Sequence, residues 1–510
     1  MSSHGSRIAK NTVFLYIRML VVMLINLYSV RLLISALGIE DYGIFNVVAS
    51  VVTVMSSISS VLQTATQRFY SFALGRKDLN YFQSIFSSSL LIHIFLTIFV
   101  ILLGETIGLW VVNYHLEIPS DKLHSINWVY QLSIFTFIFT FLHTPFSAAT
   151  IAHEDLKYFS ILSFLEAFLK FCACVYLRYF QENAIIVYGI FLLVISFLLL
   201  ISYYIIGKFK YQECNYNLEF DIPVIKELLN FSSWSLFSST ASVGISQIST
   251  ILTNIFFGPL ITGARVISFQ FNLALNSFIS SFLIAFNPVM IKSYADNSHS
   301  YLLNFFSITN KIIFYVLLII VIPVYHEMDT VLYFWLGIID HDTIEFSRYM
   351  LIYSVIMALN NPIGIIIQAS GQLKEYSLKV ESLTLLVLPL TYVLFKLGFP
   401  AKYSFFVMIF CALFAHIVRL KVLRKYFTVY SHKTYLKSFV IPAIIVMIIS
   451  NFAVQQVHNN VDNIIERFIA VLIIAILFVI FLSLFIGFTL DERSLILKKV
   501  RDLFKFHVNS

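Results

Sequence analysis

The chain has 510 residues, of which 59% are hydrophobic and 12% charged, whereas soluble domains carry about 25% charged and about 45–50% apolar residues. This composition excludes an ordinary soluble domain and is typical of a polytopic membrane protein. The formal charge of +7 does not indicate a nucleic-acid partner, because the Lys and Arg residues lie in short loops between apolar runs and so report membrane topology.

The apolar runs predict an all-α fold of fourteen transmembrane helices, since about 20 apolar residues span the hydrocarbon core of a bilayer. They form two groups of six and a final pair. The predicted spans are residues 11–37, 43–71, 83–112, 127–151, 157–179, 183–207, 227–257, 263–290, 302–326, 344–369, 377–396, 402–420, 436–457 and 464–487. A short apolar piece within 326–342 is predicted to be either re-entrant or interfacial.

The positive charges orient the chain in the membrane. Basic clusters such as Arg76-Lys77 and Arg419 to Lys437 follow even-numbered spans, so the positive-inside rule places them and both termini in the cytoplasm. A basic tail with spaced apolar residues predicts an amphipathic helix on the inner leaflet, with a frayed tail as the alternative. The predicted domains are a first six-helix bundle over 1–207, a cytoplasmic linker over 208–226, a second bundle over 227–425, two extra helices over 426–490 and the tail over 491–510.

An internal repeat relates the two predicted bundles. Adding 220 to the residue numbers brings Gly38 onto Gly258 and Gly43 onto Gly263, and adding 217 brings Pro145 onto Pro362. Because six spans return the chain to the same side, the two copies have the same orientation, and a pseudo-two-fold axis along the membrane normal relates them. Two such bundles favour transport by alternating access.

Charged and polar residues within spans are candidates for substrate binding, because such groups are costly in lipid. Arg18, Asn26 and Arg31 lie in the first span, and Gln67 and Arg68 close the second. Arg18 is predicted to face a cleft. For Arg31 the alternative is snorkelling to the outer headgroups, and for Arg68 it is an anchor at the inner interface. No metal ligands are predicted.

Two further pairs are candidates for coupling and for motion. Glu166 precedes Lys170 by one helical turn in the fifth span, which favours an ion pair. The pair is either a neutral structural link or a proton-dependent switch, so no cofactor is predicted beyond H⁺ or Na⁺ coupling. Pro145 and Pro362 each remove a helix hydrogen bond, and we predict that they act as hinges or simply shape their helices.

Two runs in the opening stretch, ALGIEDYGIFNVV and ATQRFYSFALGRKD, resemble the polysaccharide-translocase branch of the multidrug/oligosaccharidyl-lipid/polysaccharide exporter superfamily. The most specific parts are LGxxDYGxxN and the Gln-Arg-Phe that ends the second span. The resemblance implies an O-antigen or capsule flippase of the bacterial inner membrane, with roles in lipopolysaccharide or other surface polysaccharide assembly. The implied substrate is a short oligosaccharide on a polyprenyl diphosphate. Polysaccharide polymerase and chain-length proteins, besides membrane lipids, are the implied partners.

Two other functions compete with the flippase. A cation-coupled exporter of drugs or metabolites in the same superfamily would resemble its relatives in carrying acidic residues inside the bundle, and the first, second, seventh and eighth spans hold none beyond Glu227 at the membrane edge. A glycolipid polymerase would resemble its relatives in carrying a large outer loop, which this chain lacks. We find no nucleotide-binding loop or nucleophile motif, so the sequence predicts a transporter and no enzyme.

Overall fold

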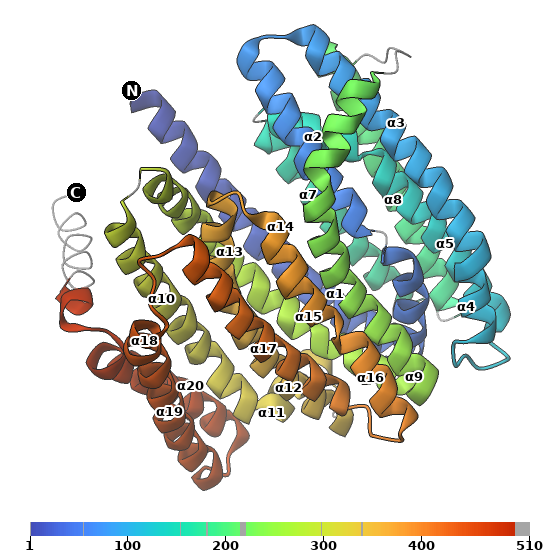
Figure 1. Cartoon of the computed structure of the whole chain (residues 1–510). Coiled ribbons are helices and arrows are strands. Elements are labelled where there is room, and N and C mark those ends of the chain that lie inside the picture. Colours follow the sequence, from blue (N-terminus) through green and yellow to red (C-terminus); the bar gives the residue numbers. More distant parts are fainter. Residues whose placement is uncertain are drawn as a thin grey trace. The chain divides into compact units, whose positions relative to one another are not determined.

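The computed structural model describes residues 2–494 except 55, 154, 180–181, 215–220, 297 and 338–339, without the side chains of residues 2–20 and a few other helical positions. Over this part the chain is helical and contains no strand (Figure 1). The predicted all-α membrane fold is therefore confirmed. Helices are the expected solution, because in lipid each backbone N–H and C=O must find its partner within its own segment.

The described residues divide into two compact units, which are described separately. Unit 1 comprises residues 1–267 and 384–404, and unit 2 comprises residues 268–383 and 405–510. The helices of unit 1 are α1 (Ser2–Thr53), α2 (Ser56–Arg76), α3 (Leu79–Leu103), α4 (Leu109–Tyr114), α5 (Leu123–Leu142), α6 (Thr144–Ala152), α7 (Leu156–Leu177), α8 (Ala184–Lys210), the first part of α9 (Ile222–Ala295), the second half of α15 (Ser382–Leu385) and α16 (Val387–Lys396).

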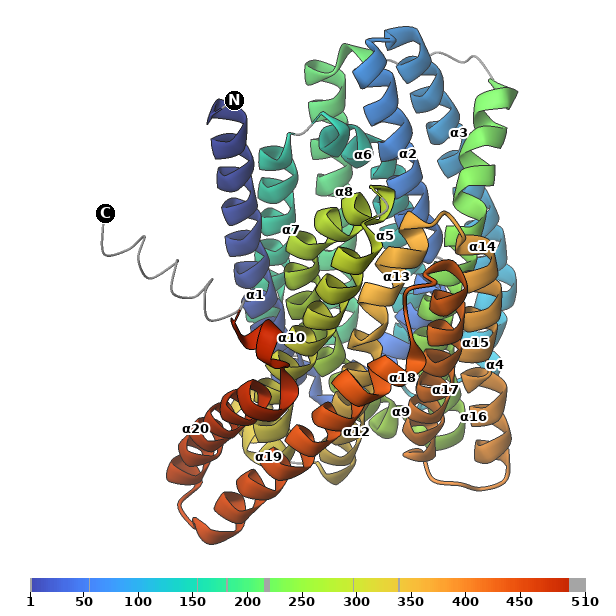
Figure 2. The same ribbon diagram turned by 60° about the vertical axis from the view of Figure 1, so that its left-hand side comes forward.

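Unit 2 has its own apolar core and ends in a helical hairpin. Its helices are the rest of α9, then α10 (His299–His326), α11 (Met328–Leu336), α12 (His341–Ala358), α13 (Asn360–Ala369), α14 (Leu373–Tyr376), nearly all of α17 (Tyr403–Tyr426), α18 (His432–Tyr435), α19 (Ile441–Asn460) and α20 (Ile464–Leu482). Figures 1 and 2 show α19 and α20 running side by side, and both pack against α10.

Twelve helical stretches among the described residues are long and apolar enough to cross a membrane. They account for the fourteen predicted spans, because Val21–Thr53 and Leu236–Ser280 each contain parts of two. The uncertain piece within 326–342 contains the nine-residue helix α11, which is too short to span a bilayer. Of the predicted tail, residues 491–494 are helical and 495–510 lie outside the described residues.

The two long helices are broken at the glycines that the repeat predicted. Gly38 has φ 78° and ψ 169°, and Gly258 has φ 77° and ψ −177°. This backbone region is essentially restricted to glycine, because a β-carbon would clash. The same break at both positions separates the two predicted spans on either side, and it supports the 220-residue repeat.

The two breaks pack against each other reciprocally. A β-carbon on Gly43 would overlap the carbonyl oxygen of Pro259, and one on Gly263 would overlap the carbonyl oxygen of Ile39. Ile39 and Pro259 are themselves related by the 220-residue offset. A two-fold axis produces such an exchange of contacts, in which residue i meets j and j meets i. All four residues belong to unit 1.

Candidate functional site

The sequence-predicted cations of unit 1 lie on α1 and α2. The side chains of Asn26, Arg31 and Arg68 are exposed, and that of Gln67 is half-buried. The Arg18 side chain lies outside the described residues. Ser29, which shares the predicted polar stripe of α1, is buried and donates a hydrogen bond to the carbonyl of Ile25 in its own helix at 2.7 Å.

The most specific sequence motif, residues 37–46, surrounds the break within α1. Asp41 pairs with Lys122 at 2.6 Å, and hydrogen bonding to Asp41 raises the pKa of the Lys122 ammonium. Tyr42 is buried, and the Asn46 side chain donates to the Tyr42 carbonyl at 2.7 Å. Together with the Gly43 contact, these interactions give the motif a structural role in the helix break.

Both predicted hinge prolines lie just after a break between two helices. Pro145 follows the break between α5 and α6, and Pro362 follows the break between α12 and α13. In each case proline stands in the first turn of the new helix, where its missing N–H costs no intrahelical bond. Both are buried.

Polar contacts tie these short helices to their neighbours. Ser59 and Thr144 lie 2.9 Å apart, and Gln63 donates to Ser147 at 2.8 Å, so α6 is bonded to α2. In unit 2 a ring nitrogen of His416 lies 2.8 Å from the Asn360 amide oxygen, which ties α13 to α17. Any bending at these prolines must move the bonded helix as well.

The predicted Glu166–Lys170 pair forms on α7. Lys170 Nζ lies 2.7 Å from Glu166 Oε1, and both side chains are about two-fifths exposed, at 40% and 39%. The geometry is that of an i,i+4 ion pair, which lowers the cost of two charges in a span. It is compatible with either the structural link or the switch.

Unit 2 contains a buried ion pair that the sequence analysis missed. Lys311 lies within the predicted span 302–326 and is fully buried, and its Nζ lies 2.6 Å from Glu492 Oε2. Ser307 donates to the other oxygen of Glu492 at 3.2 Å. A lone lysine nine residues into an apolar run was the available signal, but its partner stands 181 residues later, beyond any local pattern.

A second buried cluster joins α11 to the hairpin. Glu327 is fully buried and accepts hydrogen bonds from Arg467 at 2.9 and 3.2 Å and from Thr330 at 2.7 Å, and it lies 2.7 Å from a ring nitrogen of His458. Burial alone would raise the pKa of the Glu327 carboxyl, but the hydrogen bonds from Thr330, His458 and Arg467 outweigh it and lower the pKa. The Glu327 cluster therefore holds the α19–α20 hairpin, and Lys311–Glu492 holds the segment that follows it.

A large cavity lies between these two attachments, which we call the apolar cavity. Its volume is about 690 Å³, and α10, α12, α17 and α19 form its walls. The lining is hydrocarbon and aromatic except for the polar groups of Tyr325, His416, Tyr435, Asn451 and Gln455. On α19, Ile448 is 58% exposed and Phe452 60% exposed. Because α19 is long and apolar enough to cross a membrane, these exposed side chains would lie against lipid there.

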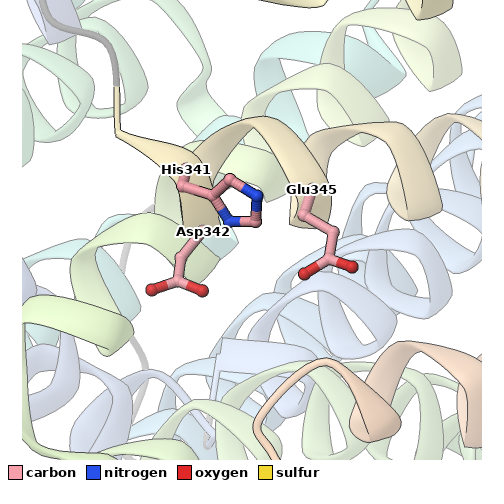
Figure 3. Close-up of side chains that lie close together, drawn as sticks. All are labelled: His341, Asp342 and Glu345. Carbon is pink, nitrogen blue, oxygen red and sulfur yellow. The ribbon is translucent and has the colours of Figure 1, made fainter.

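A small group of possible metal ligands lies at the start of α12 (Figure 3). The ligand atoms of His341, Asp342 and Glu345 lie within 4.8 Å of one another, and His341 is exposed. Glu345 also accepts a hydrogen bond from Tyr349 at 2.8 Å. Acidic residues are favoured in the first turn of a helix without any ligand, so we assign no metal site here.

The fold is shared with known membrane transporters. No protein-family model matches the chain. An inward-facing multidrug resistance MATE family transporter of the MOP superfamily superposes with a TM-score of 0.66 and 14% identity, over 82% of this chain and 98% of that one. The lipid II flippase MurJ, in an inward closed conformation, superposes with a TM-score of 0.65 and 13% identity, over 92% of this chain and 98% of that one.

One curated sequence is also similar. The uncharacterized membrane protein EpsK of Bacillus subtilis (strain 168) is 21% identical over 292 residues, which are 55% of this chain and 56% of that protein. The chain therefore spans about half the length of this relative. These likenesses establish the fold of MATE and MurJ transporters.

Proposed function

We propose that the protein moves a lipid-linked oligosaccharide across the bacterial inner membrane by alternating access, for surface polysaccharide assembly. The observation that carries this proposal is the apolar cavity of unit 2. A space of about 690 Å³ lined by side chains such as Leu318, Val355 and Ile444 suits a hydrocarbon chain, because burial of apolar surface is worth about 25 cal/mol per Å².

The proposed substrate also carries a diphosphate, which requires cations. A diphosphate is best bound by arginines, whose planar guanidinium groups can donate two hydrogen bonds to one phosphate. Exposed Arg31 and Arg68 of unit 1, with Arg18, are the proposed cations. The hydrocarbon chain stays at the lipid-facing apolar cavity while the head crosses, so the polar and apolar parts of the substrate need different surfaces.

A small-molecule exporter is the second candidate, and one observation favours it: the superposition on a MATE transporter is as good as that on MurJ. Such an exporter would bind a soluble substrate and would not need a lipid-facing cavity. We therefore expect the two functions to differ in their response to filling that cavity.

The proposed flippase also has a defined orientation, energy source and set of partners. Both termini lie in the cytoplasm, and H⁺ or Na⁺ drives transport, with Glu166–Lys170 as the proposed coupling pair. Partners are the polymerase and chain-length proteins that would receive the lipid-linked sugar. A transport rate that does not change between about pH 5 and 8 would count against Glu166–Lys170 as a proton switch.

The test uses the full chain in vesicles that contain a fluorescent polyprenyl-diphosphate oligosaccharide. Bleaching by a membrane-impermeant reductant reports the fraction in the outer leaflet over time. The wild type should exchange the probe between leaflets. Ala443→Phe should fill the cavity and slow this exchange roughly tenfold or more. The matched control, Ile473→Phe on the exposed face of α20, should leave the exchange rate unchanged. No exchange by folded wild type under an imposed ion gradient would contradict the proposal, and export of a cationic dye instead would support the second candidate.

A further inference from the structure

A second and smaller cavity of unit 2 lies next to the apolar cavity, and we call it the polar chamber. Its volume is about 280 Å³, and its walls come from residues 303–308 of α10, residues 429–438 and residues 489–492. Tyr435 lines both cavities. The apolar cavity, which suits hydrocarbon, and the polar chamber therefore meet at the Tyr435 side chain.

The polar part of the chamber's lining consists of hydroxyl, carboxylate and amide groups, which stand beside apolar side chains such as Leu303 and Ile308. Its described lining contains no Lys or Arg, and its hydrogen-bonding side chains include Ser307, Thr434, Ser438, Thr489, Asp491 and Glu492. Hydroxyls both donate and accept hydrogen bonds, and carboxylates accept them. Such a lining suits a ligand rich in hydroxyl groups.

The polar chamber does not suit a phosphate. The nearby cation Lys311 is held by Glu492 at 2.6 Å, and the backbone N–H of Thr489 donates to the same carboxylate oxygen at 2.8 Å. A phosphate entering the chamber would meet the carboxylates of Asp491 and Glu492 without a cation to balance it. Like charges in a partly buried site repel strongly, because little water screens them.

Aromatic rings form one wall of the polar chamber. The ring centroids of Tyr430 and Tyr435 lie 5.7 Å apart, and Phe306 lies 6.2 and 6.4 Å from them. Within the described part of the chain, the buried hydroxyls of both tyrosines have no hydrogen-bond partner. Leaving a buried hydroxyl unpaired is unfavourable, and a ligand that supplies a partner removes that cost.

From these contacts we propose that the polar chamber binds the carbohydrate head of a glycolipid whose hydrocarbon chain occupies the apolar cavity. The inference rests on the proposed function and adds a loading site, which the predicted topology places on the cytoplasmic side. In this loading step, which precedes binding of the diphosphate by the arginines of the proposed function, the phosphates that join head and chain remain at the protein surface. There the exposed Lys433 and Lys437 stand two residues before and after Tyr435, and basic residues at a membrane surface attract phosphate.

The experiment measures head-group selectivity without transport. The full chain in nanodiscs is labelled with a dodecyl maltoside that carries a photoreactive diazirine in its alkyl chain, and labelled peptides are identified by mass spectrometry. We expect labelling in residues 436–460. We also expect dodecyl maltoside to compete at least about fivefold better than dodecyl phosphate, because the maltoside head makes at least one hydrogen bond more in the polar chamber than the phosphate head does. Equal or better competition by dodecyl phosphate would overturn the inference.

Matched variants locate the selectivity. Thr434→Val with Ser438→Ala removes two hydroxyls of the polar chamber and should abolish the preference for maltoside while the alkyl labelling persists. Ser450→Ala, on α19 and outside both linings, should leave the preference unchanged. An unchanged preference in the double variant, at wild-type thermal stability, would refute the assignment.

The two proposals fail in different ways. If the wild type shows the maltoside preference but flips no lipid-linked oligosaccharide, the polar chamber stands as a glycolipid site and the flippase is wrong. If the wild type flips the lipid but prefers dodecyl phosphate, the flippase stands and the polar chamber is wrongly assigned.

Discussion

Replacing Gly43 or Gly263 by alanine tests the reciprocal packing of the two helix breaks. In both cases the added β-carbon meets a backbone carbonyl oxygen, that of Pro259 or of Ile39, and a backbone cannot yield as a flexible side chain can. Overpacking costs about 1–3 kcal/mol, and the upper end applies here. Alanine regains about 1 kcal/mol of helix propensity over glycine. Each variant should therefore lose about 2 kcal/mol of unfolding free energy.

The double variant gives the sharper result. Once one β-carbon has separated the two turns, the second meets less resistance, so the combined loss should fall short of the sum by about 1 kcal/mol. Unfolding by SDS titration in mixed micelles, followed by tryptophan fluorescence, measures all three losses. The control is Gly364→Ala, because no atom beyond its chain neighbours and its own helix backbone lies within 4 Å of the added β-carbon. Strict additivity, or a Gly43 variant as stable as the control, would refute the reasoning.

Three other changes test the buried charges and the helix breaks. Glu327→Gln should lower the free energy of unfolding by about 2 kcal/mol at neutral pH. The folded-state pKa of Glu327 lies below 4.5, so wild type loses this stabilisation as the pH falls through that pKa, and the thermal unfolding of the two proteins should then become more alike. Lys311→Ala should cost about 3–5 kcal/mol by leaving Glu492 unpaired, and adding Glu492→Ala should recover part of that loss in the same titration. Alanine at Gly38 or Gly258 should cost about 1–3 kcal/mol of strain, which limited proteolysis at the breaks would report as faster cleavage.

Local patterns determined the fold class, the spans and the repeat. Span length follows from bilayer thickness, so apolar runs located each membrane crossing without reference to the rest of the chain. Gly38 and Gly258 stood out for a similar reason: a glycine-only backbone conformation depends on the residue itself. The Glu166–Lys170 pair was also predictable, because its partners stand one helical turn apart.

Only the tertiary structure determined how the buried charges of unit 2 are paired and where its two cavities lie. In the sequence Lys311 is an unexplained charge within an apolar run. The fold explains it, because it places a carboxylate oxygen of Glu492, 181 residues later in the chain, 2.6 Å from the Lys311 ammonium. Likewise, the apolar cavity and the polar chamber arise from gaps between helices that are distant in sequence. The hydrophobic periodicity of a helix does not show where such a gap will form. Sequence determines which faces a helix must bury, whereas packing determines which of those faces meet and where space is left between them.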